Sequence, residues 1–386
     1  MGAAFDLPAG WIAEATGGRL VAGDAARTVS GLSIDTRTLQ PGALYVAIRG
    51  ERLDGHAFIA DAVTRGAAGV LVSDGSTAGQ APGVFVIVVA DTLVALQQLG
   101  REIRRRAASI VVAITGSAGK TTTKEVTAVL LAGRHEVFRN RGNLNNHIGL
   151  PLSLAELTSG PDVAVVELGM NHKGEISALM ALAEPEIRVW TNVGDAHIGF
   201  FVSRDAIADA KAEILERARP SDRLIVNADD PLIASRASAF RGRVITFGLA
   251  EGATVRATRI EPRGIDGTDA TIETPKGAVA VTVPLVGMGN LLNVLAAVAV
   301  AIELDVPLDE IAAGIASLKP AAKRGEVIRR SDGITLVDDS YNSSPAALTQ
   351  SLAALAASEA GRRAAVLGEM LELGDHAVVL HEECGR

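Results

Sequence analysis

A run of small residues followed by a lysine and three threonines is the strongest chemical signal in the sequence, Gly116-Ser117-Ala118-Gly119-Lys120-Thr121-Thr122-Thr123. Glycine allows backbone N–H groups to face phosphate oxygens, lysine can reach the terminal phosphates of a nucleotide, and a threonine hydroxyl can bind Mg²⁺. The spacing is unusual, because two residues separate Gly116 from Gly119 where the common phosphate loop has four. We therefore predict that residues 116–122 bind ATP or GTP, which leaves kinase, ATPase and ligase chemistry open.

The segments on both sides of this loop have the character that such a site requires. Residues 109–115 (SIVVAIT) are typical of a buried strand, and residues 121–133 (TTTKEVTAVLLAG) have apolar residues at helical spacing. The glycines would then lie at a strand-to-helix turn. A helix that begins at this turn adds the partial positive charge of its N-terminus to the phosphate site.

Two other side chains that could take part in chemistry follow strand-like runs. Glu167 ends the run DVAVVE, and His197 follows IRVWTNVGDA. Ligand sites of parallel sheets lie at the carboxyl ends of the strands, so a carboxylate at position 167 is a natural Mg²⁺ ligand. The alternatives are a solvated glutamate at a strand end and a histidine that caps or packs inside the fold.

Lys211 lies in a segment with helical periodicity. Ile207, Lys211 and Leu215 recur every four residues in RDAIADAKAEILE, which places the lysine on the apolar face of a helix. Burial disfavours the ammonium form and lowers its pKa. A neutral amine can combine with CO₂ to form a carbamate, an anion that can bind a metal. The alternative is a side chain whose stem covers apolar surface while its ammonium stays in water.

Composition and charge exclude several classes of protein. The chain has 386 residues with 48% apolar content, enough for two or three domains with their own cores. The net charge is −8 and the charges of both signs are interspersed, so we expect no nucleic-acid partner and no membrane-binding patch. The longest apolar run, VLAAVAVAIEL, is shorter than the roughly 18 residues that a membrane span needs.

The cysteine content and the first residues indicate the compartment. Cys384 is the single cysteine, which excludes an intrachain disulfide and fits a reducing environment. The first 18 residues have neither the basic region nor the apolar region of a signal peptide. We therefore predict a cytoplasmic protein without membrane insertion.

The order of strand-like and helix-like segments predicts an α/β protein with three parts. Residues 1–105 contain short strand-like runs at 43–48, 68–72 and 84–89, with a helix between the first two. Residues 106–318 alternate apolar runs with helical segments, as in a parallel sheet covered on both faces, but residues 253–285 have the period-two pattern of antiparallel strands. Residues 317–327 look like a linker. A strand at 333–339, a helix at 344–355 and a strand at 362–370 are expected after it.

Several motifs together resemble the Mur ligase family. They are the shortened loop with its triple threonine, NRGNLNNHIGLPLSL (140–154), VVELGMNHKGEI (165–176), NVGDAHIGFF (192–201), VDDSYNSSPAAL (337–348), VLGEMLELGDHAVVLH (366–381) and SIDTRTLQPGALYVAIRGERLDGHAFI (33–59). The resemblance covers essentially the whole chain. It implies a small UDP-sugar-binding α/β domain (1–105), a central P-loop ATPase domain with a parallel sheet (106–318) and a Rossmann-like acceptor domain (319–386). The family's last domain normally continues further, so we expect this one to be incomplete.

The resemblance also implies roles for individual residues. Catalytic roles are expected for Lys120, Lys211 and His197, and metal ligation for Thr121, Glu167, His197 and a carbamylated Lys211. The nucleotide would also contact Asn290, Asn293, Arg324 and Asp339, although Gly289 stands where the family commonly has histidine. The donor and acceptor would contact Asp35, Thr36, Arg37, Asp54, Gly55, His56, Asn145, Asn146, Tyr341 and Asn342. Read without the resemblance, the two asparagines near 290 could equally be a helix cap and a surface residue, and Arg324 and Asp339 a linker charge and a turn residue.

The function implied by the resemblance is a peptide-bond-forming ligase of peptidoglycan precursor synthesis. It would use ATP and Mg²⁺ to join D-alanyl-D-alanine to UDP-N-acetylmuramoyl-tripeptide through an acyl phosphate, and we expect it to act as a monomer. The alternatives are a sister ligase that adds a single amino acid and a noncatalytic protein that binds the precursor. The sister ligase that adds the third amino acid carries a DNPR motif, which is absent here.

Overall fold

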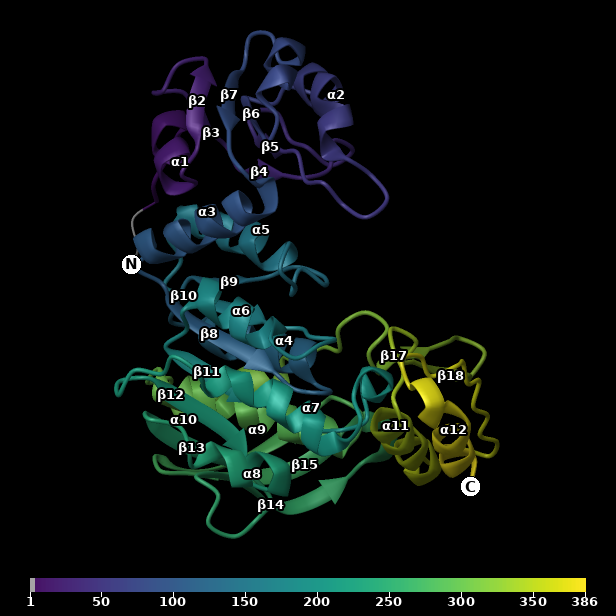
Figure 1. Ribbon diagram of the computed structural model, residues 1–386. Helices are drawn as coiled ribbons and strands as arrows, with labels where there is room; N and C mark the ends of the chain where they lie inside the picture. Colours follow the sequence, from purple (N-terminus) through teal and green to yellow (C-terminus); the bar gives the residue numbers. More distant parts are fainter. Residues whose placement is uncertain (1–3) are drawn as a thin grey trace. The chain divides into compact units, whose positions relative to one another are not determined.

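Residues 4–386 are described by the computed structural model, apart from the side chains of residues 76–78 (Figure 1). The chain divides into two units. Unit 1 takes in the chain up to Ser109 together with Asn140–Ala164 and Ala181–Glu184. Unit 2 contains Ile110–Arg139, Val165–Met180 and Pro185–Arg386. The chain therefore passes between the two units repeatedly.

A five-stranded sheet in the order β2-β7-β6-β5-β4 forms the centre of unit 1. β4 to β7 are parallel and β2 is antiparallel to β7, while β1 and β3 form a separate antiparallel pair. The strands predicted at 43–48, 68–72 and 84–89 are confirmed as β5, β6 and β7. The strands are β1 (Leu7–Pro8), β2 (Arg19–Ala22), β3 (Thr28–Val29), β4 (Leu32–Ser33), β5 (Leu44–Val46), β6 (Gly69–Val72) and β7 (Phe85–Val88).

Helices of unit 1 pack on this sheet and on each other. Tyr45, Ile59, Val70 and Val86 are buried in one apolar core between the sheet and α2. Asp91 begins α3, because its carboxylate accepts the N–H groups of the first turn. The helices are α1 (Ala9–Ala15), α2 (Ile59–Thr64), α3 (Thr92–Arg106) and α5 (Gly149–Ala155), with short 3₁₀ turns at η1 (Gly55–Phe58), η2 (Gly75–Gln80) and η3 (Glu156–Ser159).

A nine-stranded sheet in the order β16-β15-β14-β13-β12-β11-β8-β10-β9 forms the centre of unit 2. Along the part β8-β11-β12-β13-β14 of this order, each strand is parallel to the next. The pairs β14-β15 and β15-β16 are antiparallel. The antiparallel region predicted at 253–285 is therefore confirmed. The strands are β8 (Ile110–Thr115), β9 (Val137–Arg139), β10 (Val163–Glu167), β11 (Ile187–Trp190), β12 (Arg223–Asn227), β13 (Arg243–Gly248), β14 (Val255–Pro262), β15 (Thr268–Thr274) and β16 (Gly277–Val283).

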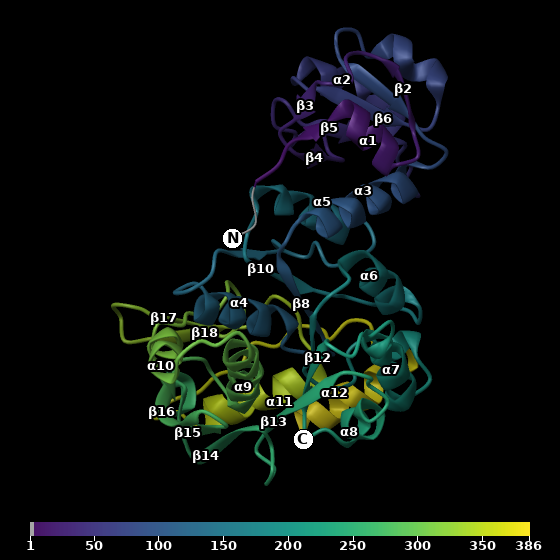
Figure 2. The same cartoon turned by 90° about the vertical axis from the view of Figure 1, so that its left-hand side faces the viewer.

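Two groups of helices cover the two faces of this sheet, as Figure 2 shows. α4, α9 and α10 lie on one face, and α6, α7 and α8 on the other. α9 is buried along most of its length, which explains its nearly continuous apolar sequence. The helices are α4 (Lys120–Leu131), α6 (Glu175–Ala183), α7 (Arg204–Lys211), α8 (Pro231–Ala237), α9 (Met288–Glu303) and α10 (Leu308–Ala316), and η4 (Ile198–Phe200) and η5 (Ala212–Leu215) are 3₁₀ turns.

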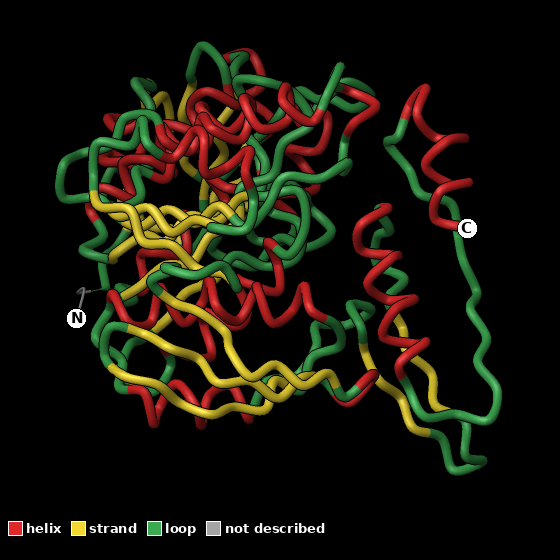
Figure 3. The backbone as a smooth tube through the Cα atoms, turned by 90° about the horizontal axis from the view of Figure 1, so that it is seen from below, coloured by secondary structure: helices red, strands yellow, loops and turns green. Residues whose placement is uncertain are grey.

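The last part of unit 2 differs in one respect from the sequence prediction. The expected strand and helix are confirmed as β18 (Thr335–Asp338) and α11 (Pro345–Ala357), and β17 (Glu326–Arg329) pairs antiparallel with β18. The strand predicted at 362–370 is wrong. Figure 3 shows loop between α11 and α12 (Ala377–Gly385), where only η7 (Gly374–His376) is regular. Val366 and Leu367 are exposed there, and an apolar run forms a strand only beside a partner.

Across the described residues, no helix is both long and apolar enough to cross a membrane. The domain boundaries predicted at residues 105 and 318 stay predictions, because each of the two units combines several separate stretches of the sequence.

Candidate functional site

The glycine-rich loop lies between β8 and α4, as the sequence predicts. Gly116 and Gly119 have φ angles of 153° and 79°, which favour glycine. A Cβ on Gly116 would lie 1.9 Å from Thr191 Oγ1, and one on Gly119 would lie 2.1 Å from Asn293 Oδ1. Both glycines are therefore required by the close packing of the loop as well as by its backbone conformation.

The end of β11 supports this loop from the side. Ser117 N–H donates to the carbonyl of Asn192 at 3.0 Å, and Ala118 N–H donates to the Asn192 side-chain oxygen at 2.8 Å. The hydroxyl of Thr191 donates to the carbonyl of Ala118 at 2.8 Å. These contacts fix the loop in one conformation before any ligand binds.

Lys120 folds back over the loop from the first residue of α4. Its Nζ donates to the carbonyl of Gly116 at 2.8 Å and lies 3.4 Å from the carbonyl of Ser117. Burial lowers the pKa of the Lys120 ammonium and Arg324 adds to this shift, while the carboxylates of Glu167 and Glu372 oppose it. The terminal amine is thus held by carbonyls of its own loop. Thr122 lies half-buried in the same turn of α4.

Glu167 meets the threonine of the loop at the carboxyl end of β10. The Thr121 hydroxyl donates to Glu167 Oε2 at 2.7 Å, and Glu167 is buried. A hydroxyl and a carboxylate are the hard oxygen donors that Mg²⁺ prefers. No cluster of three or more His, Cys, Asp or Glu that could hold a metal is present in the part of the chain that the structure describes.

His197 lies at the beginning of η4 in the left-handed conformation, with φ of 68°. Its Nδ1 is 2.5 Å from Glu372 Oε2. Burial and the charge of Lys120 lower the pKa of His197, and Glu372 opposes them. The ring is thereby placed beside the phosphate loop, as the predicted metal role requires.

Lys211 is buried at the end of α7, with 1% of its surface exposed. Burial lowers its pKa well below the usual value, and the positive charge of Lys120 lowers it further. The predicted position on the apolar face of a helix is confirmed, and the alternative with the ammonium in water is excluded. Carbamylation of this amine stays a prediction.

Asn290 and Asn293 lie on one face of α9 and are joined by a hydrogen bond of 3.1 Å. Asn290 also donates to the carbonyl of Val286 at 2.8 Å, and Asn293 is buried against Gly119. The helix is capped by Gly287, so neither asparagine is the cap, and Asn293 is not a surface residue. Their packing beside the loop is compatible with a nucleotide site.

The predicted residues of the C-terminal part form a second group within unit 2. The guanidinium of Arg324 lies over the ring of Tyr341, 4.0 Å from its centre. Asp339 accepts a hydrogen bond of 2.8 Å from Ser351, and burial raises the pKa of its carboxyl. Tyr341 and Asn342 are exposed. Arg324 connects this group to the phosphate loop, since its charge acts on Lys120.

The predicted sugar-site residues of unit 1 fall into two turns. Arg37 forms an ion pair of 2.6 Å with Asp35, and the Thr36 side chain hydrogen-bonds to Asp61. In the other turn, Asp54 Oδ1 is 2.6 Å from His56 Nδ1, and His56 Nε2 accepts the N–H of Ser73 at 3.0 Å.

The second of these turns is rigid. The N–H and ring of His56, together with Arg49, lower the pKa of Asp54 to about 2. A Cβ on Gly55 would lie 2.8 Å from the backbone of Ile48. The turn is therefore built around the ionised carboxylate and the glycine, which explains the Asp-Gly-His sequence.

Asn145 and Asn146 lie before α5 in unit 1. The Asn146 side chain accepts the N–H groups of Ile148 and Gly149, at 3.1 and 2.8 Å, and so supports the beginning of α5. A structural role is thus evident for Asn146 in addition to the predicted binding role.

Sequence reasoning missed two acidic residues, one that contacts a predicted site residue and one that follows such a residue in the sequence. Glu372 lies against His197, and no spacing signal connects residues so far apart in the chain. Glu213 is buried two residues after Lys211 and accepts the N–H groups of Gly174 and Ser177 at 2.7 and 3.0 Å. No periodicity signal identifies Glu213, because a position two residues after Lys211 does not share the face of Ile207, Lys211 and Leu215.

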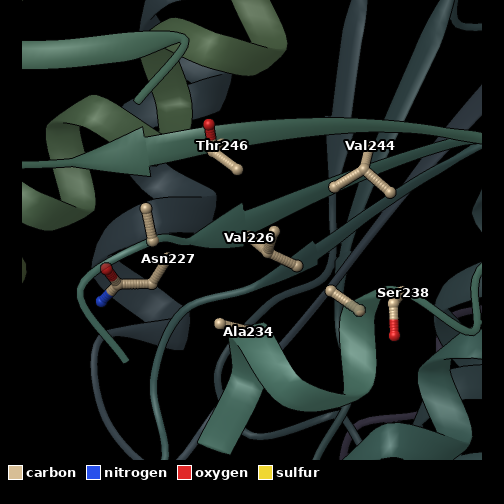
Figure 4. A pocket seen from close by; sticks show the side chains of 8 residues that line it. Val226, Asn227, Ala234, Ser238, Val244 and Thr246 are labelled. Atoms are coloured by element: carbon tan, nitrogen blue, oxygen red, sulfur yellow. The ribbon is translucent and has the colours of Figure 1, made fainter. Parts of the chain in front are cut away.

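A pocket of about 340 Å³ lies elsewhere in unit 2, between β12, β13 and α8 (Figure 4). It is lined by Val226, Asn227, Ala228, Ala234, Ala237, Ser238, Val244 and Thr246. None of these residues is charged and none was predicted as a site residue. The pocket therefore lacks the groups that bind phosphate or Mg²⁺, and it is separate from the cluster around Lys120.

Comparison with known proteins gives matches along almost the entire chain. Residues 28–104 match the model described as Mur ligase family, catalytic domain, residues 114–301 match the Mur ligase middle domain, and residues 323–386 match the Mur ligase, glutamate ligase domain.

Among curated proteins, UDP-N-acetylmuramoyl-tripeptide--D-alanyl-D-alanine ligase of Bacillus subtilis is 35% identical over 97% of this chain and 81% of its own length. The protein of the same name from Escherichia coli is 38% identical over 93% of this chain and 78% of its own length.

Solved structures give the same result. A crystal structure of MurF from Acinetobacter baumannii matches 99% of this chain and 83% of its own, with a TM-score of 0.91 and 33% identity. MurF ligase from Thermotoga maritima in complex with ADP matches 92% of this chain and 81% of its own, with a TM-score of 0.82 and 32% identity. The α/β fold with a large, mainly parallel sheet is thereby confirmed.

Proposed function

The chain belongs to the Mur ligase family, and we propose that it is an ATP-dependent ligase that joins D-alanyl-D-alanine to UDP-N-acetylmuramoyl-tripeptide. Relatives named for this reaction match more than nine tenths of the chain. The observation in the structure that best supports the proposal is the convergence of Lys120, Thr121, Glu167 and Lys211 beside a preformed phosphate loop.

The reaction forms an amide in two steps. A carboxylate oxygen of the tripeptide attacks the γ-phosphorus of ATP and ADP leaves, which gives an acyl phosphate. The amine of the dipeptide then attacks the acyl carbon, phosphate leaves with its bonding electrons, and the amine loses a proton. The first step brings two anions together, so positive charge must be supplied where they meet.

The residues of the loop would supply part of that charge. The N–H groups of the loop that are not bonded to Asn192 would face the phosphate oxygens, and Lys120 would leave the Gly116 carbonyl to reach the γ-phosphate. Asn290 and Asn293 would contact the adenine, and Arg324 and Asp339 would contact the phosphate and the ribose. The supporting observation is that Asn293 packs on Gly119 and that the charge of Arg324 acts on Lys120.

Mg²⁺ would be held by Thr121, Glu167, His197 and the carbamate form of Lys211, and when bound it neutralises charge between the two anions. The oxygen donors at Thr121 and Glu167 fit this ion. Lys211 is buried and its pKa is lowered well below the usual value, which favours the uncharged amine, the form that combines with CO₂. The resulting carbamate would carry a negative charge toward the positive charge of Lys120.

The remaining predicted roles are part of the same proposal. Unit 1 would bind the UDP-sugar part of the donor through the turns at 35–37 and 54–56, with Asn145 and Asn146, and Tyr341 and Asn342 would face the dipeptide. We retain the domain boundaries at residues 105 and 318, a monomeric state and a cytoplasmic location as parts of this proposal.

The test is phosphate release by the purified 386-residue chain. The proposal expects release that requires ATP, Mg²⁺, UDP-N-acetylmuramoyl-tripeptide and D-alanyl-D-alanine together, with the ligated product identified by mass. A panel of amine acceptors distinguishes the related reactions, because a preference for a single amino acid over the dipeptide would overturn the proposed acceptor. Binding of donor and ATP without any product would instead indicate a precursor-binding protein.

The carbamate has its own test. Lys211→Ala should lose most of the rate, and short carboxylates such as formate or acetate should restore part of it by taking the place of the carbamate. Lys211→Arg should not substitute, because the guanidinium keeps its charge and cannot be carbamylated. The carbamate is contradicted if no carboxylate restores any rate and high bicarbonate adds no mass at Lys211.

A further inference from the structure

Two turns of unit 2 meet beside the phosphate loop, one at 197–200 and one at 372–374. The N–H of Gly199 donates to the carbonyl of Glu372 at 2.9 Å. A Cβ on Gly199 would lie 2.6 Å from the nitrogen of Gly374 and 2.7 Å from the carbonyl oxygen of Glu372. The two backbones are therefore in direct contact, and only glycine at position 199 permits it.

The residue that faces the site from each turn is in an unfavourable backbone conformation. His197 has φ of 68° and Glu372 has φ of 63°, although neither is glycine. The left-handed conformation is unfavourable for residues that carry a Cβ atom. Residues held in this way are over-determined by their surroundings and are concentrated at functional sites. These conformations bring His197 Nδ1 and Glu372 Oε2 to a distance of 2.5 Å.

The position of the proton in this contact decides which ring nitrogen of His197 keeps a free lone pair. A carboxylate carries only acceptor lone pairs, and a second lone pair on Nδ1 would be repelled at 2.5 Å, so Nδ1 must carry the proton of a neutral ring in this contact. Nε2 then has the free lone pair. The ring of His56 shows such an arrangement, because its Nδ1 lies 2.6 Å from Asp54 Oδ1 and its Nε2 accepts the N–H of Ser73.

We propose that Glu372 is a positioning residue that holds His197 as the Nδ1–H tautomer and directs Nε2 toward the metal. The inference rests on the proposed function, because it takes His197 as a metal ligand. A carboxylate that accepts the second N–H of a ligating histidine is a general device that fixes the ring and increases its basicity. Here the carboxylate comes from the C-terminal part of the chain, so the metal site of the central sheet is complete only when residues 372–374 are docked.

The charges around the pair agree with this role. The positive charge of Lys120 acts on His197, and the negative charge of Glu372 opposes it. Without the carboxylate, the ring would lie near the charge of Lys120 with nothing to fix its tautomer or its orientation.

The tautomer can be measured directly in the wild-type protein. With ¹⁵N-labelled histidine at pH 8, the signal of His197, assigned by its loss in His197→Gln, should show a protonated Nδ1 and an unprotonated Nε2. The opposite tautomer in the wild-type chain would overturn the inference without the need for any variant of Glu372.

The variants test the consequence for the metal. Binding of Mn²⁺, as a probe for Mg²⁺, is measured by electron paramagnetic resonance in the presence of a nonhydrolysable ATP analogue. Glu372→Ala should weaken it by about 10- to 100-fold. Glu372→Gln should lose less, because its amide oxygen still accepts the Nδ1 proton. Glu369→Ala is the matched control, since Glu369 is an exposed glutamate of the same loop and should bind Mn²⁺ like wild type.

The outcomes distinguish failure of the proposed function from failure of the positioning role of Glu372. If the wild-type chain releases no dipeptide-dependent phosphate, the proposed function fails. If wild type is active but Glu372→Ala binds Mn²⁺ as tightly as Glu369→Ala, only the positioning role fails. Circular dichroism and urea midpoints show whether each variant is folded, and the wild-type tautomer decides the question if Glu372→Ala is not.

Discussion

Lys120 and Lys211 show how one residue type serves two purposes within the same cluster. Lys120 is half-buried and its amine is satisfied by the carbonyls of its own loop, so it can move to a phosphate. Lys211 is fully buried with its pKa lowered well below the usual value, which favours its neutral form. Differences in burial thus support different proposed roles for the two lysines, a mobile charge and an amine that combines with CO₂.

Replacement of Lys120 tests the first role. Lys120→Ala should reduce phosphate release by roughly 10²–10³-fold, the usual loss when one preorganised donor to developing charge is removed. The fold should remain intact, because the hydrogen bonds of the Lys120 amine go to carbonyls of its own loop. Lys173→Ala, which removes an exposed lysine, is the control. Turnover within a few fold of wild type would contradict the assignment of the phosphate loop.

Replacement of Lys211 tests its burial through the pH dependence of stability. Because the pKa is lowered in the folded state, the unfolded chain binds an extra proton at any pH between the folded pKa and the unfolded value of about 10.4. Stability of the wild type should therefore rise with pH in this window. In Lys211→Met this position does not titrate, so the variant should have a higher free energy of unfolding than wild type. This difference should shrink by up to about 1.4 kcal/mol per pH unit between pH 8 and 10.

The measurement is urea unfolding in buffers free of CO₂, which prevents carbamylation. Lys173→Met is the matched control, because this exposed lysine should give no pH-dependent difference from wild type. A Lys211→Met advantage that stays constant from pH 8 to 10 would show that the amine is charged in the folded protein.

At the scale of helices and strands, the helical segment that carries Lys211 is held by contacts with α6 and with β11. Glu213 connects η5 to the beginning of α6, which follows the Glu167 loop. Arg188 of β11 donates to the carbonyls of Ile214 and Glu216 at 2.9 and 2.6 Å and forms a buried ion pair of 2.9 Å with Asp222. The end of the segment is therefore tied to the sheet itself.

The connection through Glu213 gives a prediction for stability. A glutamine has only one acceptor oxygen, so Glu213→Gln leaves one of the two N–H groups of Gly174 and Ser177 facing an amide NH₂. The cost of an unsatisfied buried donor is about 1–3 kcal/mol in free energy of unfolding. Glu216→Gln is the control, because Glu216 is exposed and accepts only the Ser177 hydroxyl, and it should change stability by less than about 0.5 kcal/mol. Equal effects of the two variants would contradict the buried connection.

Local patterns in the sequence predict the elements of this fold well because each element depends mainly on its own periodicity. Period-two alternation identifies the antiparallel strands β14 to β16, and the four-residue spacing of Ile207, Lys211 and Leu215 identifies the buried lysine. The false strand at 362–370 has the right apolar residues but no partner strand. The contact of Glu372 with His197 depends on the approach of two turns, which no local pattern contains.

At the scale of the whole molecule, the loop between α11 and α12 is the most exposed connection of the C-terminal part. Val366 is 99% exposed and Leu371 is 64% exposed, whereas Met370 and Leu373 are buried. An apolar segment in this state is typical of a site that associates with other surfaces or is attacked by proteases.

Limited proteolysis tests this exposure. Trypsin at low concentration should cut first after Arg362 or Arg363, because the backbone there is exposed and outside any helix or strand. Mass spectrometry of the first fragments locates the cut. Primary cleavage within α9 or the nine-stranded sheet, with residues 361–371 still intact, would contradict the expected order.

The division of unit 1 into three separate stretches of chain has a consequence for biosynthesis. On the ribosome, α3 is complete at Arg106, but its partner α5 follows only after β8, α4 and β9 have been made, and residues 181–184 follow later still. At synthesis rates of ~5–20 residues per second, the nascent first domain must wait for several seconds with the α5-facing side of α3 uncovered. The amino-terminal unit is therefore finished only after translation of the phosphate loop, so the order of translation differs from the order in which the two units can fold.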